Sequence, residues 1–273
     1  MSILLAALAA GAAPAPLIPP LEIPRPSARA RAAPAPALPV LSQAEHSERG
    51  RTCAALAKAD PPAAEAEARD WIKAGGGMAA RQCLGLAQSA RERWQDAAAT
   101  FESAAKDAQI AQNSMAVVLW MQAGNSALAG DEPVRARAAF DKALAIPGLS
   151  NEMKGEVYLD RARAGVAASD LTGAKADLEQ ATRLVPRDPL GWLLRANLAR
   201  RMKEMPLAFS AIREAAALSP EDAAIAYEAG NIAAAAGNMA DARAAWTRAA
   251  QRAPDSDAGQ AATLALQGGA EAR

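Results

Sequence analysis

A pattern of small and large residues recurs five times along this chain, and it constrains the possible folds more than any other feature. Each copy has alanine, a large apolar residue and alanine at positions i, i+4 and i+7, which places all three on one face of a helix. The copies are Ala97, Phe101 and Ala104; Ala136, Phe140 and Ala143; Ala174, Leu178 and Ala181; Ala208, Ile212 and Ala215; and Ala242, Trp246 and Ala249.

A small residue precedes each copy by twelve positions, and we call it the anchor of that unit. Successive anchors are 39, 38, 34 and 34 residues apart, and a period of this length with two helices per unit is typical of a stacked α-solenoid. Since only Gly or Ala lets helix backbones come close, we expect Gly124 to face Ala136 and Gly230 to face Ala242, with the large residue filling the gap toward the next unit. The anchors are Gly85, Gly124, Ala162, Ala196 and Gly230.

The units resemble tetratricopeptide repeats (TPRs). The 34-residue pattern of that family has a large residue and Leu-Gly on its first helix, helix A, and Ala, a large residue, Ala and Pro on its second, helix B. Arg161 and Arg195 depart from it, because they stand where the family usually has Leu. The matches are Leu84-Gly85, Trp120 with Gly124, Tyr158 with Ala162, Trp192 with Ala196, and the closing prolines Pro186, Pro220 and Pro254.

The resemblance implies an all-α fold, a right-handed α-solenoid of stacked antiparallel helix pairs. Five TPR units are expected over residues 78–254, an N-terminal capping helix pair over 41–77, and a C-terminal capping helix and tail over 255–273. Asp188 and Ser219 are predicted to cap the helices that follow them, with Pro189 and Pro220 in the first helical position. Surplus residues near 107–113 and 147–151 are predicted to lie in connections.

Composition argues against several classes of function. Thirty basic and thirty acidic residues give no net charge, so nothing in the charge favours nucleic acid as a partner. The single histidine, His46, lies far from any partner for metal binding or for activating a nucleophile. The run Gly75-Gly76-Gly77 lacks the Lys-Ser/Thr of a phosphate loop. We therefore predict a protein that is not an enzyme and has no cofactor or metal.

The first forty residues differ from the rest. Residues 1–13 read as a signal-peptide-like segment, with an apolar run too short to span a bilayer and a cleavage pattern at Ala10-Gly11-Ala12. Residues 14–40 hold nine prolines among alanines, which predicts an extended, disordered linker. We expect a periplasmic or secreted protein without a stable membrane span. The alternatives are a disordered tail, a mis-chosen start codon, a marginal anchor and a cytoplasmic protein.

The two cysteines lie 30 residues apart, Cys53 in the capping pair and Cys83 in helix A of the first unit. First helices of adjacent units stack side by side, so this offset brings the thiols together. If the chain is exported, we expect a Cys53–Cys83 disulfide. The alternative is a pair of inert, partly buried thiols.

In the TPR family, helix A lines a concave groove, and the positions three before and one after the anchor point into it. The resemblance therefore implies a site for an extended peptide, with apolar pockets for side chains, amides for the backbone and arginines for an acidic residue or a C-terminal carboxylate. The apolar positions are Met121, Leu159, Leu193 and Tyr227; the polar ones are Asn125, Arg163, Asn197 and Asn231, with Arg200 and Arg201 one turn further on.

Two alternatives stand beside this site. Asn after the anchor is common in the family and fits a purely structural role, and the next helix can cover the apolar positions. Two function classes follow: a protein- or peptide-binding adaptor, or a scaffold that self-associates or docks a larger complex through its convex face or its ends. Trp71, Trp94 and Trp246 are the candidate contacts of such a scaffold, although the central position of Trp246 in its triplet favours a packing role. The sequence leaves the oligomeric state open.

Overall fold

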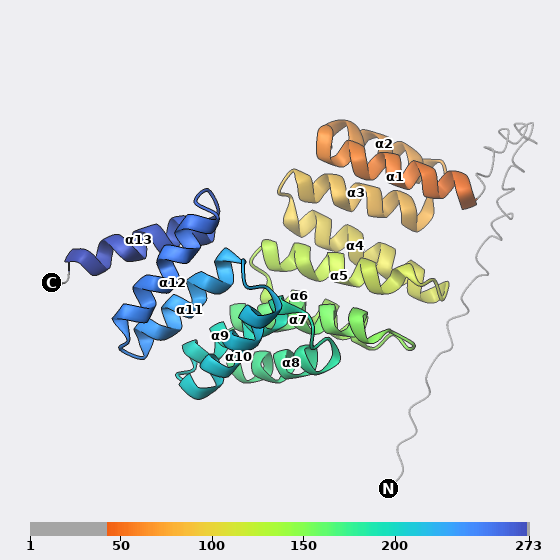
Figure 1. Ribbon diagram of the computed structural model, residues 1–273. Helices are drawn as coiled ribbons and strands as arrows, with labels where there is room; N and C mark the ends of the chain where they lie inside the picture. The colour runs from red at the N-terminus through yellow and green to blue at the C-terminus, as the bar shows by residue number, and fades with distance from the viewer. Residues whose placement is uncertain (1–42, 272–273) are drawn as a thin grey trace, which may run out of the picture. The chain divides into compact units, whose positions relative to one another are not determined.

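The computed structural model describes residues 43–271 of the 273-residue chain, and these residues form thirteen α-helices and no strand (Figure 1). The predicted signal-like segment and the proline-rich linker lie outside the described residues. A pair of helices comes first, and a single helix comes last. They are α1 (Gln43–Ala59) and α2 (Pro61–Lys73), and α13 (Asp257–Glu271).

Between them lie five helix pairs, each made of a helix A and a helix B joined by a short turn, in the order the repeats predict. Each helix packs against its neighbours in sequence, and the A helices of the second and third pairs also contact each other, as do those of the fourth and fifth. The predicted all-α stack of helix pairs is therefore confirmed. The pairs are α3 (Gly77–Ala90) and α4 (Trp94–Ile110); α5 (Met115–Ala129) and α6 (Pro133–Leu144); α7 (Asn151–Ala167) and α8 (Leu171–Leu184); α9 (Pro189–Arg201) and α10 (Met205–Leu218); and α11 (Ala223–Ala235) and α12 (Met239–Arg252).

The large residue of three triplets lies directly beside the anchor of its own unit. A Cβ added to Gly124 would lie 2.5 Å from Cε1 of Phe140, so this ring occupies the space beside the anchor of its own unit. The atoms nearest to Gly124 therefore belong to the large residue of its own triplet, whereas the sequence predicted Ala136 opposite Gly124 and Phe140 in the gap toward the next unit. The same holds for Gly230, whose added Cβ would lie 2.4 Å from Cδ1 of the Trp246 ring.

Anchor and large residue are matched in size throughout the array. The three glycine anchors lie beneath aromatic rings, because a ring this close leaves no room for a Cβ. The two alanine anchors share their buried clusters with aliphatic residues. The pairs are Gly85 with Phe101, Gly124 with Phe140, Gly230 with Trp246, Ala162 with Leu178, and Ala196 with Ile212.

The helix caps and the loops between helices agree with the sequence predictions except at Ser219 and near residues 107–113. Asp188 caps α9 by accepting a hydrogen bond from the Leu190 amide at 2.9 Å, with Pro189 first in the helix, as predicted. Ser219 does not cap α11, because that helix begins at Ala223 and Asp222 accepts from its first amides. The surplus residues near 107–113 partly extend α4 to its end at residue 110, whereas those near 147–151 lie mostly in the loop before α7.

A disulfide joins the N-terminal pair to the first repeat. Cys53 on α1 and Cys83 on α3 are bonded, with their Cα atoms 5.8 Å apart, and both are buried in a cluster that includes Trp71. The described part of the chain contains no helix long and apolar enough to cross a membrane. Over the same residues, no group of three or more His, Cys, Asp or Glu side chains is placed to hold a metal ion.

Candidate functional site

The asparagines that follow the anchors join neighbouring A helices. Asn125 on α5 donates to Oδ2 of Asp160 on α7 at 2.8 Å, and Asn197 on α9 donates to Oε2 of Glu228 on α11 at 3.1 Å. In both cases the donor stands one residue after its anchor and the acceptor two residues before the next anchor. We call this register the asparagine ladder. Its geometry favours the structural role of these side chains.

Near the C-terminal end of the array, Glu228 binds several of the residues that were predicted to contact a peptide. Its carboxylate is buried and accepts from Arg200 Nε at 2.7 Å, and from the side-chain amides of Asn197 and Asn231. Asn231 in turn accepts from Trp246 Nε1 at 3.0 Å. These three predicted contacts are therefore already bonded within the protein.

The ladder joins the second unit to the third and the fourth to the fifth. Between the first and second units the donor position holds Leu86, and the ladder is also interrupted between the third and fourth units. Arg163 stands in the donor position, but the acceptor position of the next unit holds Leu194, which cannot accept a hydrogen bond. Arg163 instead bonds Asp160 on its own helix at 3.2 Å, and 55% of its side chain is exposed. A pocket of about 150 Å³ opens at this interruption. Its lining, which we call the α7–α9 pocket, is Ala162, Arg163, Val166, Leu178, Leu194, Asn197 and Leu198.

The other predicted groove residues are divided between core and surface. Leu159 is buried in a cluster with Leu178. A Cβ on Gly191 would lie 3.6 Å from Cδ2 of Leu159, so the start of α9 covers Leu159. This agrees with the alternative that the next helix covers the apolar positions. Met121, Leu193 and Tyr227 are half-buried against the core clusters. Arg201 is exposed and forms no ion pair with the described residues. Of the predicted set, only Arg163 and Asn197 reach the α7–α9 pocket.

The pocket also uses residues that the sequence prediction missed. Leu194, Leu198 and Val166 supply much of its apolar wall. A signal for Leu194 was present in the sequence, since the equivalent position holds Gln122, Asp160 and Glu228 in three other units. A polar position that turns apolar in one unit marks a place where the units are not joined in the same way.

The two arginines that depart from the TPR pattern replace the usual leucine with ionic contacts. Arg161 binds the buried carboxylate of Asp177 through Nε at 2.9 Å and also reaches Asp141 on the preceding helix B. The hydrogen bond that Arg161 donates to Asp177 is the main cause that raises the pKa of Arg161. Arg195 lies over the Trp192 ring, 5.5 Å from its centroid. Both side chains therefore belong to the scaffold.

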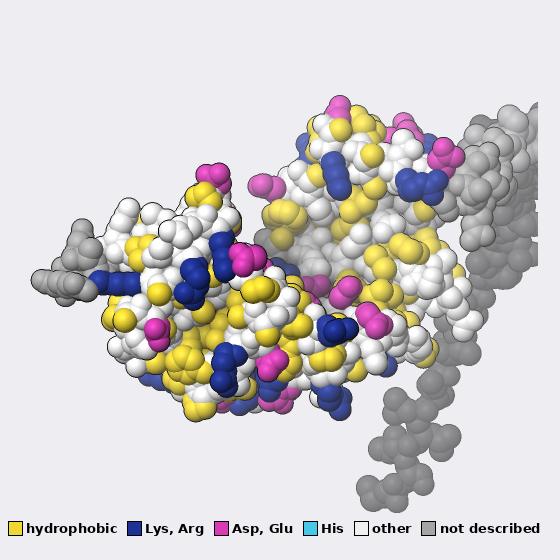
Figure 2. All heavy atoms as spheres, viewed as in Figure 1, with side chains coloured by type: hydrophobic (Ala, Val, Ile, Leu, Met, Phe, Trp, Pro, Cys, Tyr) yellow, Lys and Arg dark blue, Asp and Glu magenta, His cyan; other side chains and the backbone are white. Residues whose placement is uncertain are grey.

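Charge is evenly spread on the face seen in Figure 2, where basic and acidic side chains alternate between groups of hydrophobic ones. That view shows no continuous basic surface of the kind that nucleic acid binding requires. Of the tryptophans proposed for docking, Trp71 and Trp246 are buried in the core clusters, so neither can contact a partner without a change of fold.

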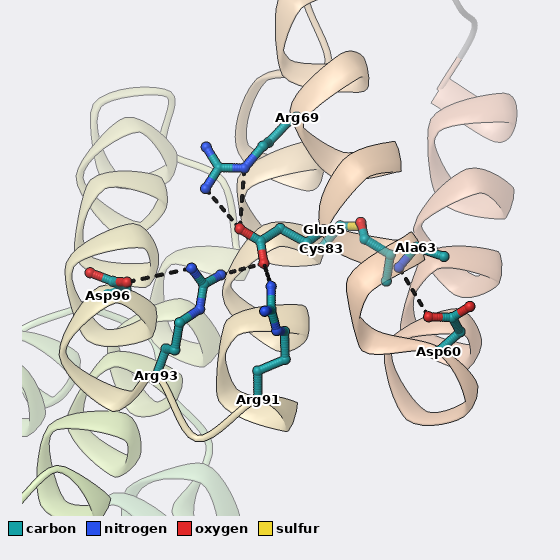
Figure 3. A network of polar contacts seen from close by, with 9 residues as sticks. Asp60, Ala63, Glu65, Arg69, Cys83, Arg91, Arg93 and Asp96 are labelled. Atoms are coloured by element: carbon teal, nitrogen blue, oxygen red, sulfur yellow. Dashed lines mark hydrogen bonds and ion pairs between the residues drawn. The ribbon is translucent and has the colours of Figure 1, made fainter.

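Among the acids in the described part of the chain, Glu65 has the pKa that is lowered most (Figure 3). It lies on α2, buried, and accepts hydrogen bonds from Arg69 on its own helix and from Arg91 and Arg93 in the turn between α3 and α4. The hydrogen bond from Arg93 is the largest cause that lowers its pKa from 4.5 to about 2, although burial acts in the opposite direction.

Glu65 is therefore expected to stabilise the N-terminal helices at neutral pH and to lose that contribution as the pH falls from about 4.5 to about 2. In this window the carboxyl of Glu65 binds a proton in the unfolded chain but stays ionised in the folded protein, and this difference favours unfolding. Hydrogen exchange should be measured in α1 to α3 as the pH is lowered through this window. Protection against exchange should fall more steeply in the wild type than in Glu65→Gln. Equal slopes for the two proteins would contradict the assignment.

Comparison with known proteins places the fold. The sequence matches no protein-family model and no curated protein. PilW, a type IV pilus biogenesis factor, matches with a TM-score of 0.64 and 17% identity over 81% of this chain and 99% of its own. TTC0263, a TPR protein of Thermus thermophilus, matches with 0.55 and 20% identity over 70% and 100%, respectively. YrrB, described as a TPR protein with an unusual peptide-binding site, matches with 0.51 and 18% identity over 72% and 96%. At these identities the likeness is one of fold.

Proposed function

This chain has the tetratricopeptide-repeat fold, and we propose that it is a non-enzymatic adaptor that binds an extended segment of a partner protein at the α7–α9 pocket. The interruption of the asparagine ladder carries this proposal. Where the ladder is complete, the polar side chains between A helices are bonded to one another. At the interruption between the third and fourth units, a guanidinium and an apolar cavity are left for a ligand.

The chemistry of the pocket indicates the ligand. A volume of about 150 Å³ with walls of Val166, Leu178 and Leu194 suits one aliphatic side chain. Arg163 is held only by Asp160, one turn away on the same helix, and such exposed pairs contribute little. Its guanidinium is therefore available to a carboxylate. Asn197 uses its amide nitrogen on Glu228, which leaves its oxygen to accept from a peptide N–H.

We infer a ligand in which an aliphatic residue is followed by an acidic residue or by the C-terminal carboxylate. By analogy of fold, YrrB, a protein with a peptide-binding site, and PilW, a biogenesis factor, support a role in protein interaction. Export to the periplasm or the medium is part of the proposal. It is supported by the signal-like residues 1–13 and by the disulfide, since disulfides persist in oxidising compartments.

The decisive variant is Leu194→Glu. It places a carboxylate at the position where Asp160 and Glu228 stand in the complete parts of the ladder, so Arg163 gains a partner and the pocket loses an apolar wall. Binding should be measured by fluorescence anisotropy with peptides that end in an aliphatic residue. The variant is expected to weaken binding by about tenfold to a hundredfold, the contribution of one buried aliphatic side chain.

Leu190→Glu is the matched control, because it makes the same substitution on the same helix at an exposed residue outside the pocket. It should bind as the wild type does. Amidation of the peptide's C-terminus, when that carboxylate is the only acid, should reduce binding to wild type but not to Arg163→Ala. Binding that is unchanged in Leu194→Glu, or no binding by any peptide of the set, would overturn the proposal. A concentration-dependent oligomer in size-exclusion experiments would favour the scaffold alternative.

A further inference from the structure

Three arginines converge on one buried carboxylate where the N-terminal helix pair meets the first repeat (Figure 3). Arg69 reaches Glu65 from α2 through Nε and Nη2, while Arg91 and Arg93 reach it from the turn that follows α3. Glu65 is 6% exposed, but the side chains of Arg69, Arg91 and Arg93 are 54%, 41% and 34% exposed. We call these four residues the Glu65 cluster.

The cluster has more guanidinium groups than carboxylates to pair with them. Outside the cluster, Asp96 is the only acid among residues 43–271 that pairs with these arginines, 3.8 Å from Arg93 and mostly exposed. Glu92, between two of them in sequence, forms no ion pair with any described residue. The ratio is reversed at Arg135 and at Arg161, each of which pairs with two carboxylates.

The bonds to Glu65 also fix which donors remain. Arg69 uses Nε and Nη2, which leaves Nη1, and Arg91 uses Nη1, which leaves Nε and Nη2. Both side chains reach the surface, and the buried carboxylate holds each guanidinium in place. Arg93 contributes further positive charge, and its Nε is buried without a hydrogen-bond partner. Guanidinium groups that are held in place in this way lose little freedom when they bind an oxyanion.

We propose that the Glu65 cluster is a docking site for an acidic segment of a partner protein, separate from the α7–α9 pocket. Carboxylate side chains of the partner bind the remaining donors of Arg69 and Arg91, and Glu65 acts as the positioning residue beneath them. The two sites lie on different elements, α2 and the α3–α4 turn for this one, and α7 to α9 for the pocket.

The test uses the full chain and a fluorescein-labelled hexaglutamate peptide, with anisotropy as the readout. The double variant Arg69→Gln/Arg91→Gln keeps a hydrogen-bond donor at each position but removes both charges. It is expected to weaken binding by at least about tenfold, because hydrogen bonds to charged groups are lost. Arg213→Gln is the control, since Arg213 is exposed on α10 and forms no ion pair with the described residues. It should change the affinity by less than about twofold.

A second measurement needs no variant. In wild-type protein the backbone amide resonances of residues 91–93 should shift on addition of the peptide, while those of α7 and α9 should not. Leu194→Glu should bind hexaglutamate as the wild type does, so failure here and failure of the pocket proposal are distinguishable. The inference would be overturned if the double variant and Arg213→Gln lost the same affinity for hexaglutamate. It would also be overturned if the amide resonances of residues 91–93 did not shift. Displacement of the peptide by an equal concentration of inorganic phosphate would show a site for phosphate instead.

Discussion

Replacing Phe140 with alanine is expected to lower the free energy of unfolding by about 3–5 kcal/mol, the usual cost of removing a buried aromatic side chain. The ring is fully buried and lies directly over Gly124, so α5 and α6 would face each other across a cavity. Urea unfolding followed by circular dichroism should show the loss, and hydrogen exchange should place it in these two helices. Phe209→Ala removes the same side chain from an exposed position on α10 and should cost less than about 1 kcal/mol.

The size match can be separated from simple loss of packing. Gly124→Ala alone adds a Cβ that would lie 2.5 Å from the Phe140 ring, so the helices must separate. Combining it with Phe140→Leu reproduces the pair that Ala162 and Leu178 already form in the third unit. We expect the double variant to be more stable than the two single changes predict by about 0.5–3 kcal/mol. Simple additivity would contradict the match.

Removing the disulfide with Cys53→Ala and Cys83→Ala is expected to destabilise the N-terminal helices by about 3–4 kcal/mol, the loop-closure value for two cysteines 30 residues apart. Because each unit of a solenoid contacts only its neighbours, the effect should be largest in α1 to α3. Hydrogen exchange with mass spectrometry can resolve it. The α11 and α12 peptides in the same sample are the internal control.

Two further observations bear on the disulfide. Both sulfurs are buried, so reduction under native conditions should be slow and should follow opening of the N-terminal helices. Protein isolated from its own compartment, denatured without reductant, should contain no free thiol. Two free thiols in that sample would contradict both the bond and the proposed export, and unchanged exchange in the alanine variant would contradict its contribution to stability.

Much of the fold was predictable because its signals are periodic. The spacing of the triplets and anchors fixed the number and order of the helix pairs, since a helix face repeats every 3.6 residues. The same spacing does not say how far a side chain reaches, so it did not reveal that the atoms nearest to Gly124 belong to the Phe140 ring. The correlation of glycine with aromatic and alanine with aliphatic residues was nevertheless present in the sequence.

The candidate site was less predictable because it depends on contacts between units. The sequence placed Asn125 and Asn197 in one row, but their acceptors stand 35 and 31 residues away, on the next helix A. Which acid meets which amide depends on how neighbouring units are offset, and a residue pattern within one unit does not contain that offset. For the same reason the pocket beside Leu194 became visible only in the structure.

The register of the asparagine ladder also limits how the gene can lose whole units. Deleting the third unit alone would bring Asn125 opposite Leu194 and leave its amide without an acceptor. Deleting the third and fourth units together would bring Asn125 opposite Glu228, which already accepts from an asparagine in that register. The longer deletion should therefore keep the hydrogen bond between the units that it brings together, whereas the shorter one should lose it. The longer deletion nevertheless removes more of the chain, including the whole ligand pocket.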